Sequence, residues 1–203
     1  MRHLFILFVF VGLLAGCAST TKVVDTSNQT AVAGMKAVMG LEYRDFEKAA
    51  MDAVNDMLES GAVNKPDGGR YVLTVSRITN DTMQRIDTDQ LVKKIRTQLL
   101  KSGKVVVSTA IGLNGAEDPM IMKARQLRQS KEVNQANVAG SGKIVAPDLS
   151  LSGKIMQKNI PLGRNKNRVE YYVQLTLSDI ESGLAFWEGE TPIIKEGGKA
   201  PIW

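Results

Sequence analysis

The sequence has 203 residues, 26 Lys and Arg against 21 Asp and Glu, and a formal net charge of +5, which suits one domain with a core plus a tether. Its one histidine, His3, and one cysteine, Cys17, exclude an intramolecular disulfide and a multi-ligand Cys/His metal site. Carboxylate pairs and Ser–Lys arrangements have no local signature here, so we predict no enzyme activity, no cofactor, no metal and no small-molecule substrate.

The first seventeen residues have the pattern of a secretory signal. A basic start, Met1-Arg2-His3, precedes an apolar run from Leu4 to Leu14, which at about eleven residues is too short to span a membrane. Leu14-Ala15-Gly16-Cys17 resembles the lipobox of bacterial lipoproteins. This resemblance implies a diacylglyceryl group on the Cys17 thiol, cleavage before Cys17 and acylation of the new amine, for example with palmitate.

Several consequences follow for the start of the chain. We expect a signal peptide over 1–16, and a mature chain that has lost its histidine and carries lipid on its cysteine; an ordinary signal peptide with an incidental cysteine is the alternative. Residues 17–41 are predicted to form the lipidated N-terminus and a flexible tether, and 42–203 the globular domain. In lipoproteins an aspartate directly after the modified cysteine directs retention in the inner membrane. Neither Ala18, directly after Cys17, nor Ser19 is an aspartate, so the resemblance implies the outer membrane.

Two helices and two strands are predicted next. Apolar residues recur at helical spacing from Phe46 to Leu58, and strand-forming residues follow over 70–78. Strand, helix, strand in this spacing indicates a parallel pair with a right-handed crossover. The predicted elements are a helix capped by Asp45 and ended by Gly61, a strand over 70–78, a helix capped by Thr88 and ended by Ser102-Gly103, and a strand over 105–107.

The stretch from Glu117 to Ala139 is basic and predicted to be helical. Glu117-Asp118-Pro119 is typical of a helix start, and we expect the helix to stop near Ser130, with a weaker helical piece over 132–139. Residues 120–170 contain ten Lys or Arg against three acids. The helix has an apolar side with Met120, Ile121, Ala124 and Leu127, and a mostly basic side with Lys123, Arg125 and Arg128. A solvated basic face is the usual explanation of such a pattern.

The last third is predicted to be an antiparallel meander. Apolar residues alternate over 148–156 and again over 169–177, with a long basic hairpin between them. Glu181-Ser182-Gly183 then turns the chain into a strand over 184–190. The predicted fold class is α/β, with one globular domain containing a mixed sheet of about five strands and helices on one or both faces.

Several stretches resemble one family. They are Ser76-Arg77-Ile78-Thr79-Asn80, Ala146-Pro147-Asp148-Leu149-Ser150-Leu151-Ser152-Gly153-Lys154-Ile155 and Phe186-Trp187-Glu188-Gly189. Together with the lipobox they resemble LpoB-type outer-membrane lipoproteins that activate bifunctional penicillin-binding proteins, and the resemblance covers roughly residues 70 to 195. It implies a fold like the N-terminal domain of TolB, a periplasmic location and a role in peptidoglycan synthesis and cell wall biogenesis.

The partner surface expected from this resemblance is basic and on one side of the domain. It combines the end of the basic helix, the outward side of one strand and the hairpin, and it would suit an acidic patch on the partner. Solubilising residues without a partner are the alternative. A periplasmic address argues against nucleic acid, and no glycine motif could hold a phosphate. A structural lipoprotein of an envelope secretion or flagellar assembly is the second functional hypothesis. The residues expected in the partner surface are Arg128, Gln129, Ser150, Ser152, Lys154 and Arg164.

Overall fold

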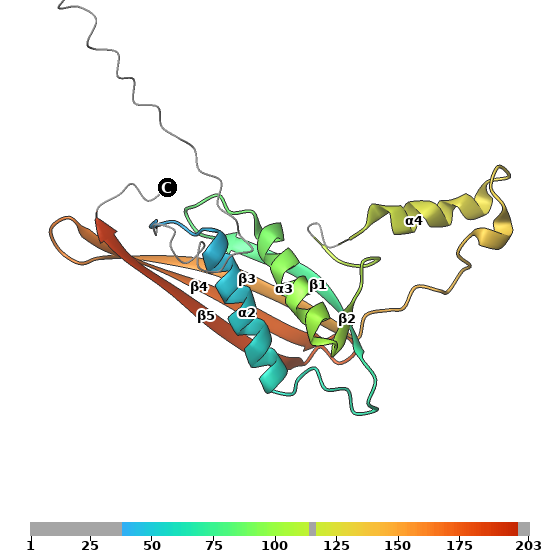
Figure 1. Ribbon diagram of the computed structural model, residues 1–203, viewed down its shortest axis with the longest axis horizontal. Helices are drawn as coiled ribbons and strands as arrows, with labels where there is room; N and C mark the ends of the chain where they lie inside the picture. The colour runs from blue at the N-terminus through green and yellow to red at the C-terminus, as the bar shows by residue number, and fades with distance from the viewer. Residues whose placement is uncertain (1–37, 114–116, 199–203) are drawn as a thin grey trace, which may run out of the picture. The chain divides into compact units, whose positions relative to one another are not determined.

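The computed structural model describes residues 38–113 and 117–198 (Figure 1). The described residues belong to one unit that begins near Ala37, and the predicted signal peptide, lipobox and most of the tether lie outside them. In chain order the elements are α2 (Tyr43–Glu59), β1 (Tyr71–Asp81), α3 (Thr88–Ser102), β2 (Val105–Val107), α4 (Pro119–Gln126), the 3-10 turns η1 (Leu127–Gln129) and η2 (Gln135–Asn137), β3 (Leu149–Pro161), β4 (Lys166–Asp179) and β5 (Ala185–Gly198).

The five strands form one mixed sheet in the order β2-β1-β3-β4-β5. The neighbours β2, β1 and β3 run parallel, with Leu73 opposite both Val107 and Leu149. The hairpins β3–β4 and β4–β5 are antiparallel. The parallel pair, the closing meander and the mixed five-stranded sheet therefore confirm the predicted fold class.

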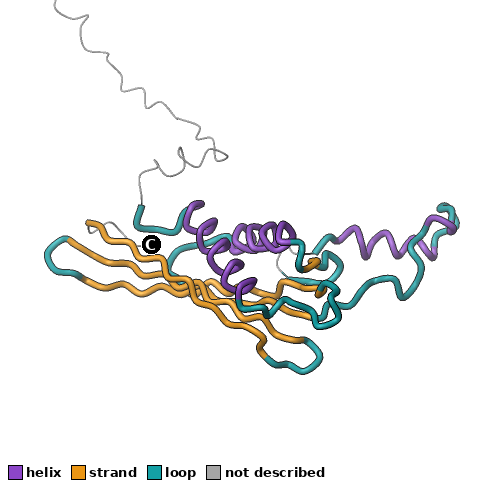
Figure 2. Tube along the Cα trace, turned by 60° about the horizontal axis from the view of Figure 1, so that its bottom comes forward, coloured by secondary structure: helices purple, strands orange, loops and turns teal. Residues whose placement is uncertain are grey.

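Helices α2 and α3 pack side by side on one face of the sheet (Figures 1 and 2). The apolar stripe predicted for α2 is buried there, with Ala49 and Val54 almost fully inaccessible. Alternate residues of the strands point towards these helices and pack against them. The fully buried strand residues include Leu73, Val75, Leu149, Leu151, Ile155, Val169, Tyr171 and Leu177.

Both predicted helix caps are wrong: the cap of α2 lies about one turn before the predicted cap Asp45, and the cap of α3 lies one residue before Thr88. Glu42 caps α2 and exchanges capping-box hydrogen bonds with Asp45, which occupies the third helical position. At α3 the cap is Asp87, whose carboxylate accepts from the Asp89 amide at 3.0 Å. Thr88 begins the helix instead. The predicted end is confirmed, since Gly103 closes α3 at φ 70°, a conformation that glycine adopts without strain.

Strands β3, β4 and β5 are longer than the apolar alternation predicted. Residues 159–161 pair with 167–169, so only 162–165 remain as the β3–β4 hairpin loop. Strand β5 continues to Gly198. Strand pairing depends on the neighbouring backbone, and it continues after the buried alternation ends. The weaker helix predicted over 132–139 contains only the short 3-10 turn η2.

The domain begins before the predicted boundary at residue 42. Leu41 is 6% exposed and lies in the core, and its backbone exchanges two hydrogen bonds with the Gln84 side chain, at 2.9 and 3.2 Å. The Lys195 ammonium binds both the Gly40 carbonyl, at 2.6 Å, and the Asp45 carboxylate, at 2.5 Å. Because these contacts close the end of the core, residues 39–41 pack with the domain.

Within 38–113 and 117–198 the structure has no helix that is both long and apolar enough to cross a bilayer.

Candidate docking surfaces

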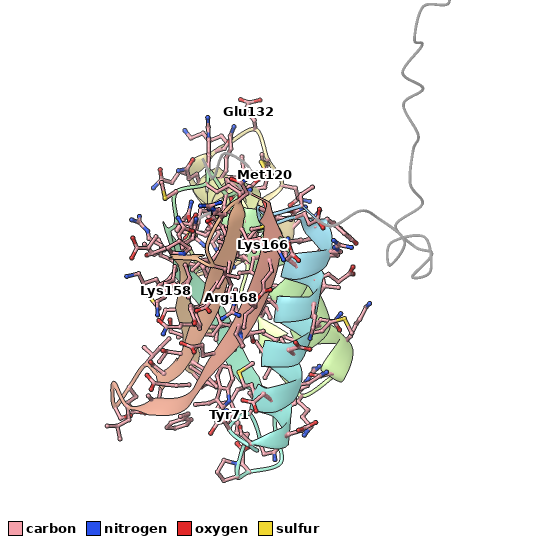
Figure 3. The ribbon with its side chains drawn as sticks, turned by 90° about the vertical axis from the view of Figure 1, so that its left-hand side faces the viewer. Tyr71, Met120, Glu132, Lys158, Lys166 and Arg168 are labelled. Carbon is pink, nitrogen blue, oxygen red and sulfur yellow. The ribbon has the colours of Figure 1, made fainter. Side chains whose placement is uncertain are left out.

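One face of the sheet is left uncovered by the helices. Figure 2 shows α2 and α3 on the other face, and Figure 3 shows Lys158 and α2 on opposite sides of the sheet. At its β1 end the open face contacts the segment after β2, where the Thr74 hydroxyl donates to the Ile111 carbonyl at 2.6 Å. We define the open face by residues that alternate with the core positions: Ser150, Ser152, Lys154, Met156 and Lys158 on β3, Arg168, Glu170, Tyr172, Gln174 and Thr176 on β4, and Glu188, Glu190, Pro192, Ile194 and Glu196 on β5.

Cross-strand pairs order the polar side chains of the open face. Arg168 binds Glu196 at 2.7 Å, and Gln174 donates to Glu190 at 2.8 Å. Each pair joins residues that are directly opposite in the antiparallel register. These pairs hold Arg168, Gln174 and their glutamate partners in place on the open face.

Tyr172 is at the centre of this face, between Met156 and Pro192 in the register. Its hydroxyl donates to the Glu170 carboxylate at 2.6 Å. That hydrogen bond, followed by burial and the nearby carboxylates, raises the pKa of Tyr172 above its usual value. The row Met156, Tyr172 and Pro192 gives the open face an apolar strip bordered by charged pairs.

The structure groups three of the six predicted partner-binding residues and separates the other three from them. Ser150, Ser152 and Lys154 lie together on the open face of β3, all partly exposed. Arg164 is in the β3–β4 loop, at the opposite end of the domain from α4 (Figure 1). Arg128 and Gln129 are exposed in η1, after α4. The six residues therefore do not form the contiguous surface that was expected.

The open face is also less basic than expected, because acidic residues occupy it from β1 and β5. Lys154 pairs with Asp81 at 2.6 Å, and Glu188, Glu190 and Glu196 all project from β5. Sequence reasoning missed Asp81 because it ended the first strand at residue 78, and it missed Glu196 because it ended the last strand at Glu190. The alternation of acidic or apolar residues with Trp187, Thr191, Ile193 and Lys195 was the signal that could have extended it.

Asp148, which lies in one of the stretches that resemble the family, has a structural role. Its carboxylate accepts from the Val72 amide at 2.8 Å and lies 3.6 Å from the Lys65 ammonium. Its backbone carbonyl accepts from the Ile180 amide at 2.9 Å. Asp148 therefore ties the start of β3 to β1 and to the β4–β5 turn, and so sets the register of the open face.

Two grooves lie on the helix side of the domain. One, of about 300 Å³, runs between α2 and α3 and is lined by Lys93, Lys94 and Lys101 together with Glu47. The other, of about 230 Å³, separates α2 from β5. There Asp56 accepts from the Trp187 indole at 2.7 Å. Among residues 38–113 and 117–198, no three His, Cys, Asp or Glu side chains are arranged to hold a metal ion.

Helix α4 starts as predicted, but most of its predicted apolar side is exposed. The Asp118 carboxylate caps it by accepting from the Met120 amide at 3.0 Å, and Pro119 follows in the first turn. No residue of the helix is buried. Met120 and Leu127, both predicted on the apolar side, are 59% and 40% exposed.

Comparison with known proteins gives a family for this chain. The sequence model of the family described as peptidoglycan-synthase activator LpoB matches residues 45–193, whereas no curated protein sequence matches the chain. Similar solved structures include the LpoB C-terminal domain from Escherichia coli, with 16% identity, 73% of this chain and 98% of that chain covered, and a TM-score of 0.46. Another is lipoprotein GNA1162 from Neisseria meningitidis, with 14% identity, 64% and 84% coverage and a TM-score of 0.35. Because the family model spans more than half of the sequence, this chain belongs to the LpoB family of peptidoglycan-synthase activators.

Proposed function

We propose that this protein is an outer-membrane lipoprotein whose domain binds a bifunctional penicillin-binding protein and activates it, and so regulates peptidoglycan synthesis. The observation that carries the proposal is the family match over residues 45–193. In this proposal the synthase supplies every catalytic group. The domain raises activity by binding the active conformation of the synthase more tightly than the inactive one.

We further propose that the domain docks through the open face, around Ser150, Ser152 and Lys154. Two features favour this face over the helix side. Its charged groups are held in cross-strand pairs, such as Lys154 with Asp81, so little side-chain entropy is lost on binding. The strip around Tyr172 also offers apolar area at the centre, with charges at the rim, as protein interfaces commonly have.

The anchor in this proposal is Cys17, at the end of the lipobox Leu14-Ala15-Gly16-Cys17. One acyl chain holds a protein only marginally, and additional chains make the attachment durable. We expect Cys17→Ser to abolish lipidation and leave an unprocessed precursor, detected by metabolic labelling with palmitate and by mobility on a gel. Normal processing at the same site in the variant would rule out Cys17 as the anchor.

The tether between the anchor and the domain is short. Twenty residues, 18–37, could reach roughly 70 Å at about 3.3–3.6 Å each if fully extended. In this proposal their role is to raise the local concentration of the domain at the membrane. The domain alone should therefore activate the synthase when its concentration is raised in solution.

A direct experiment adds residues 38–203 to a purified bifunctional penicillin-binding protein and measures glycan polymerisation from lipid II. We use this range because residues from Met39 onward pack on the core. The proposal predicts a higher polymerisation rate with the domain and no turnover by the domain alone. A domain that leaves the rate unchanged and assembles into discrete rings would instead support the hypothesis of an envelope assembly.

A further inference from the structure

The segment that contains α4 is ordered by its own hydrogen bonds, although it hardly packs on the sheet. We call residues 117–143 the α4 arm; Met120 and Glu132 mark it in Figure 3. The Asp118 amide donates to the Thr109 carbonyl at 2.8 Å and fixes the start of the arm. The Gln135 amide group donates to the Leu127 and Ser130 carbonyls, at 3.1 and 2.6 Å. Arg128 donates to the Ala139 carbonyl at 3.0 Å, so the arm is a folded element.

The helix of the arm directs its apolar stripe away from the domain. Ile121 and Arg125 line a groove of about 320 Å³ against Val106 and Val107 of the sheet edge, so this side of α4 faces the sheet. Residues spaced by three and four lie on a different side of the helix. These residues are Met120, Ala124 and Leu127, and all three are exposed.

The arm carries more basic than acidic residues. From Pro119 to Lys143 it has five Lys or Arg and a single acid, Glu132. The two acids at its base are occupied by local contacts, because Glu117 accepts from the Gly112 amide at 3.1 Å and Asp118 caps the helix. The exposed methionine and leucine side chains therefore belong to a segment with an excess of cations, a combination typical of helices that lie on anionic lipid.

We propose that the α4 arm is a reversible contact with an anionic phospholipid surface, in which Met120 and Leu127 enter the headgroup region while Lys123 and Lys131 bind lipid phosphates. The chain outside the domain favours a membrane as the occupant. Only twenty residues, 18–37, separate the domain from the proposed lipid on Cys17, and a flexible chain of that length has an average span of roughly 25 Å. This last argument depends on the proposed anchor, whereas the arm's own affinity for lipid does not.

Such a contact would hold the domain against the membrane between encounters with the synthase. A weak basic and apolar contact of this kind is strengthened by a covalent lipid on the same chain, because stable anchoring takes two signals. The open face and the arm are separate surfaces, so docking to the synthase and binding to lipid can be tested independently.

The test is flotation of residues 38–203, which lack the anchor, with vesicles of phosphatidylethanolamine and phosphatidylglycerol, and with vesicles of phosphatidylcholine alone. We expect binding to the anionic vesicles, at least about tenfold weaker binding to phosphatidylcholine, and a loss of binding in high salt. Met120→Ser with Leu127→Ser, and separately Lys123→Glu with Lys131→Glu, should each reduce binding about tenfold or more.

Matched controls change equally exposed residues elsewhere. Ile180→Ser with Leu184→Ser removes apolar side chains from the β4–β5 turn, and Lys158→Glu with Arg164→Glu reverses charges near the other hairpin. Both control variants should float like the wild-type domain, and urea midpoints should show that all four remain folded. Equal binding to both kinds of vesicle, equal loss in arm and control variants, no binding at all, or self-association through Met120 and Leu127 without lipid would each overturn the proposal.

Discussion

The two faces of the sheet use the same strands for different purposes. On β3, Leu151 is completely buried under the helices, while its neighbour Ser152 is partly exposed on the open face. On β4, Tyr171 lies in the core, and Tyr172 binds Glu170 on the open face. The helix-covered face forms the core of the domain. Side chains on the open face can be substituted without removing contacts of that core. If the domain docks as proposed, stability and recognition can therefore be altered separately, one residue apart.

The largest difference between the faces should appear when a buried side chain is shortened. Leu151→Ala leaves a cavity between β3 and the helices and should lower the free energy of unfolding by about 3 kcal/mol. Ser152→Ala, one residue along on the open face, should change it by less than about 0.5 kcal/mol. Urea unfolding followed by circular dichroism measures both, and similar losses for the two variants would show that the open face is also part of the core.

Charged pairs on the two faces should differ by a smaller amount. Lys195 and Asp45 are each only 10% exposed, so Lys195→Met leaves a carboxylate buried without its partner and should cost about 2 kcal/mol. Arg168 and Glu196, on the open face, are 37% and 55% exposed. Arg168→Met should cost less than about 1 kcal/mol. Equal costs in urea unfolding would contradict the assignment of residues 38–45 to the core of the domain.

Much of the helix-covered face could be predicted from the sequence, because burial imposes a period. The alternation over 148–156 and 169–177 and the helical spacing from Phe46 to Leu58 mark positions that all face one core. The caps were harder to predict. The cap of α2 is Glu42, although Asp45, three residues later, also suits a cap. The cap of α3 is Asp87, although Thr88 follows it directly.

The open face could be predicted only in part, because it depends on register. Ser150, Ser152 and Lys154 were correctly placed on one side of a strand, since that follows from alternation alone. That Asp81 would meet Lys154, or Glu196 meet Arg168, requires knowing which residues lie opposite or diagonal across the strands. The sequence pattern likewise grouped Arg128 and Arg164 by charge, although they lie at opposite ends of the domain.

The smallest expected effect concerns Tyr171, the core member of the two adjacent tyrosines, and the pH dependence of stability. Burial, and then the charge of Asp45, raise the pKa of Tyr171 above its usual 10.0, so the folded domain holds this proton more tightly than the unfolded chain. The resulting stability is complete below about pH 10 and is lost as pH rises through the folded-state pKa.

Tyr171→Phe should remove that component of the pH dependence. It should also cost about 1 kcal/mol at neutral pH, because the hydroxyl donates to the Met39 carbonyl at 3.1 Å. Urea midpoints of the variant and the wild-type domain between about pH 8 and pH 11, the range in which phenols ionise, check both effects. A midpoint that falls as steeply in Tyr171→Phe as in the wild-type domain would assign the pH dependence to other groups.

The measurement that tests the proposed docking most directly is the affinity of a purified bifunctional penicillin-binding protein for two matched variants of residues 38–203. One reverses charges on the open face, Lys154→Glu with Arg168→Glu, and the other reverses exposed charges on α3, Lys93→Glu with Lys101→Glu. With the synthase immobilised on a biosensor, docking through the open face predicts at least about tenfold weaker binding for the first variant and wild-type binding for the second. Loss of binding in the α3 variant, with wild-type affinity in the open-face variant, would contradict the account and place the partner on the helix-covered side.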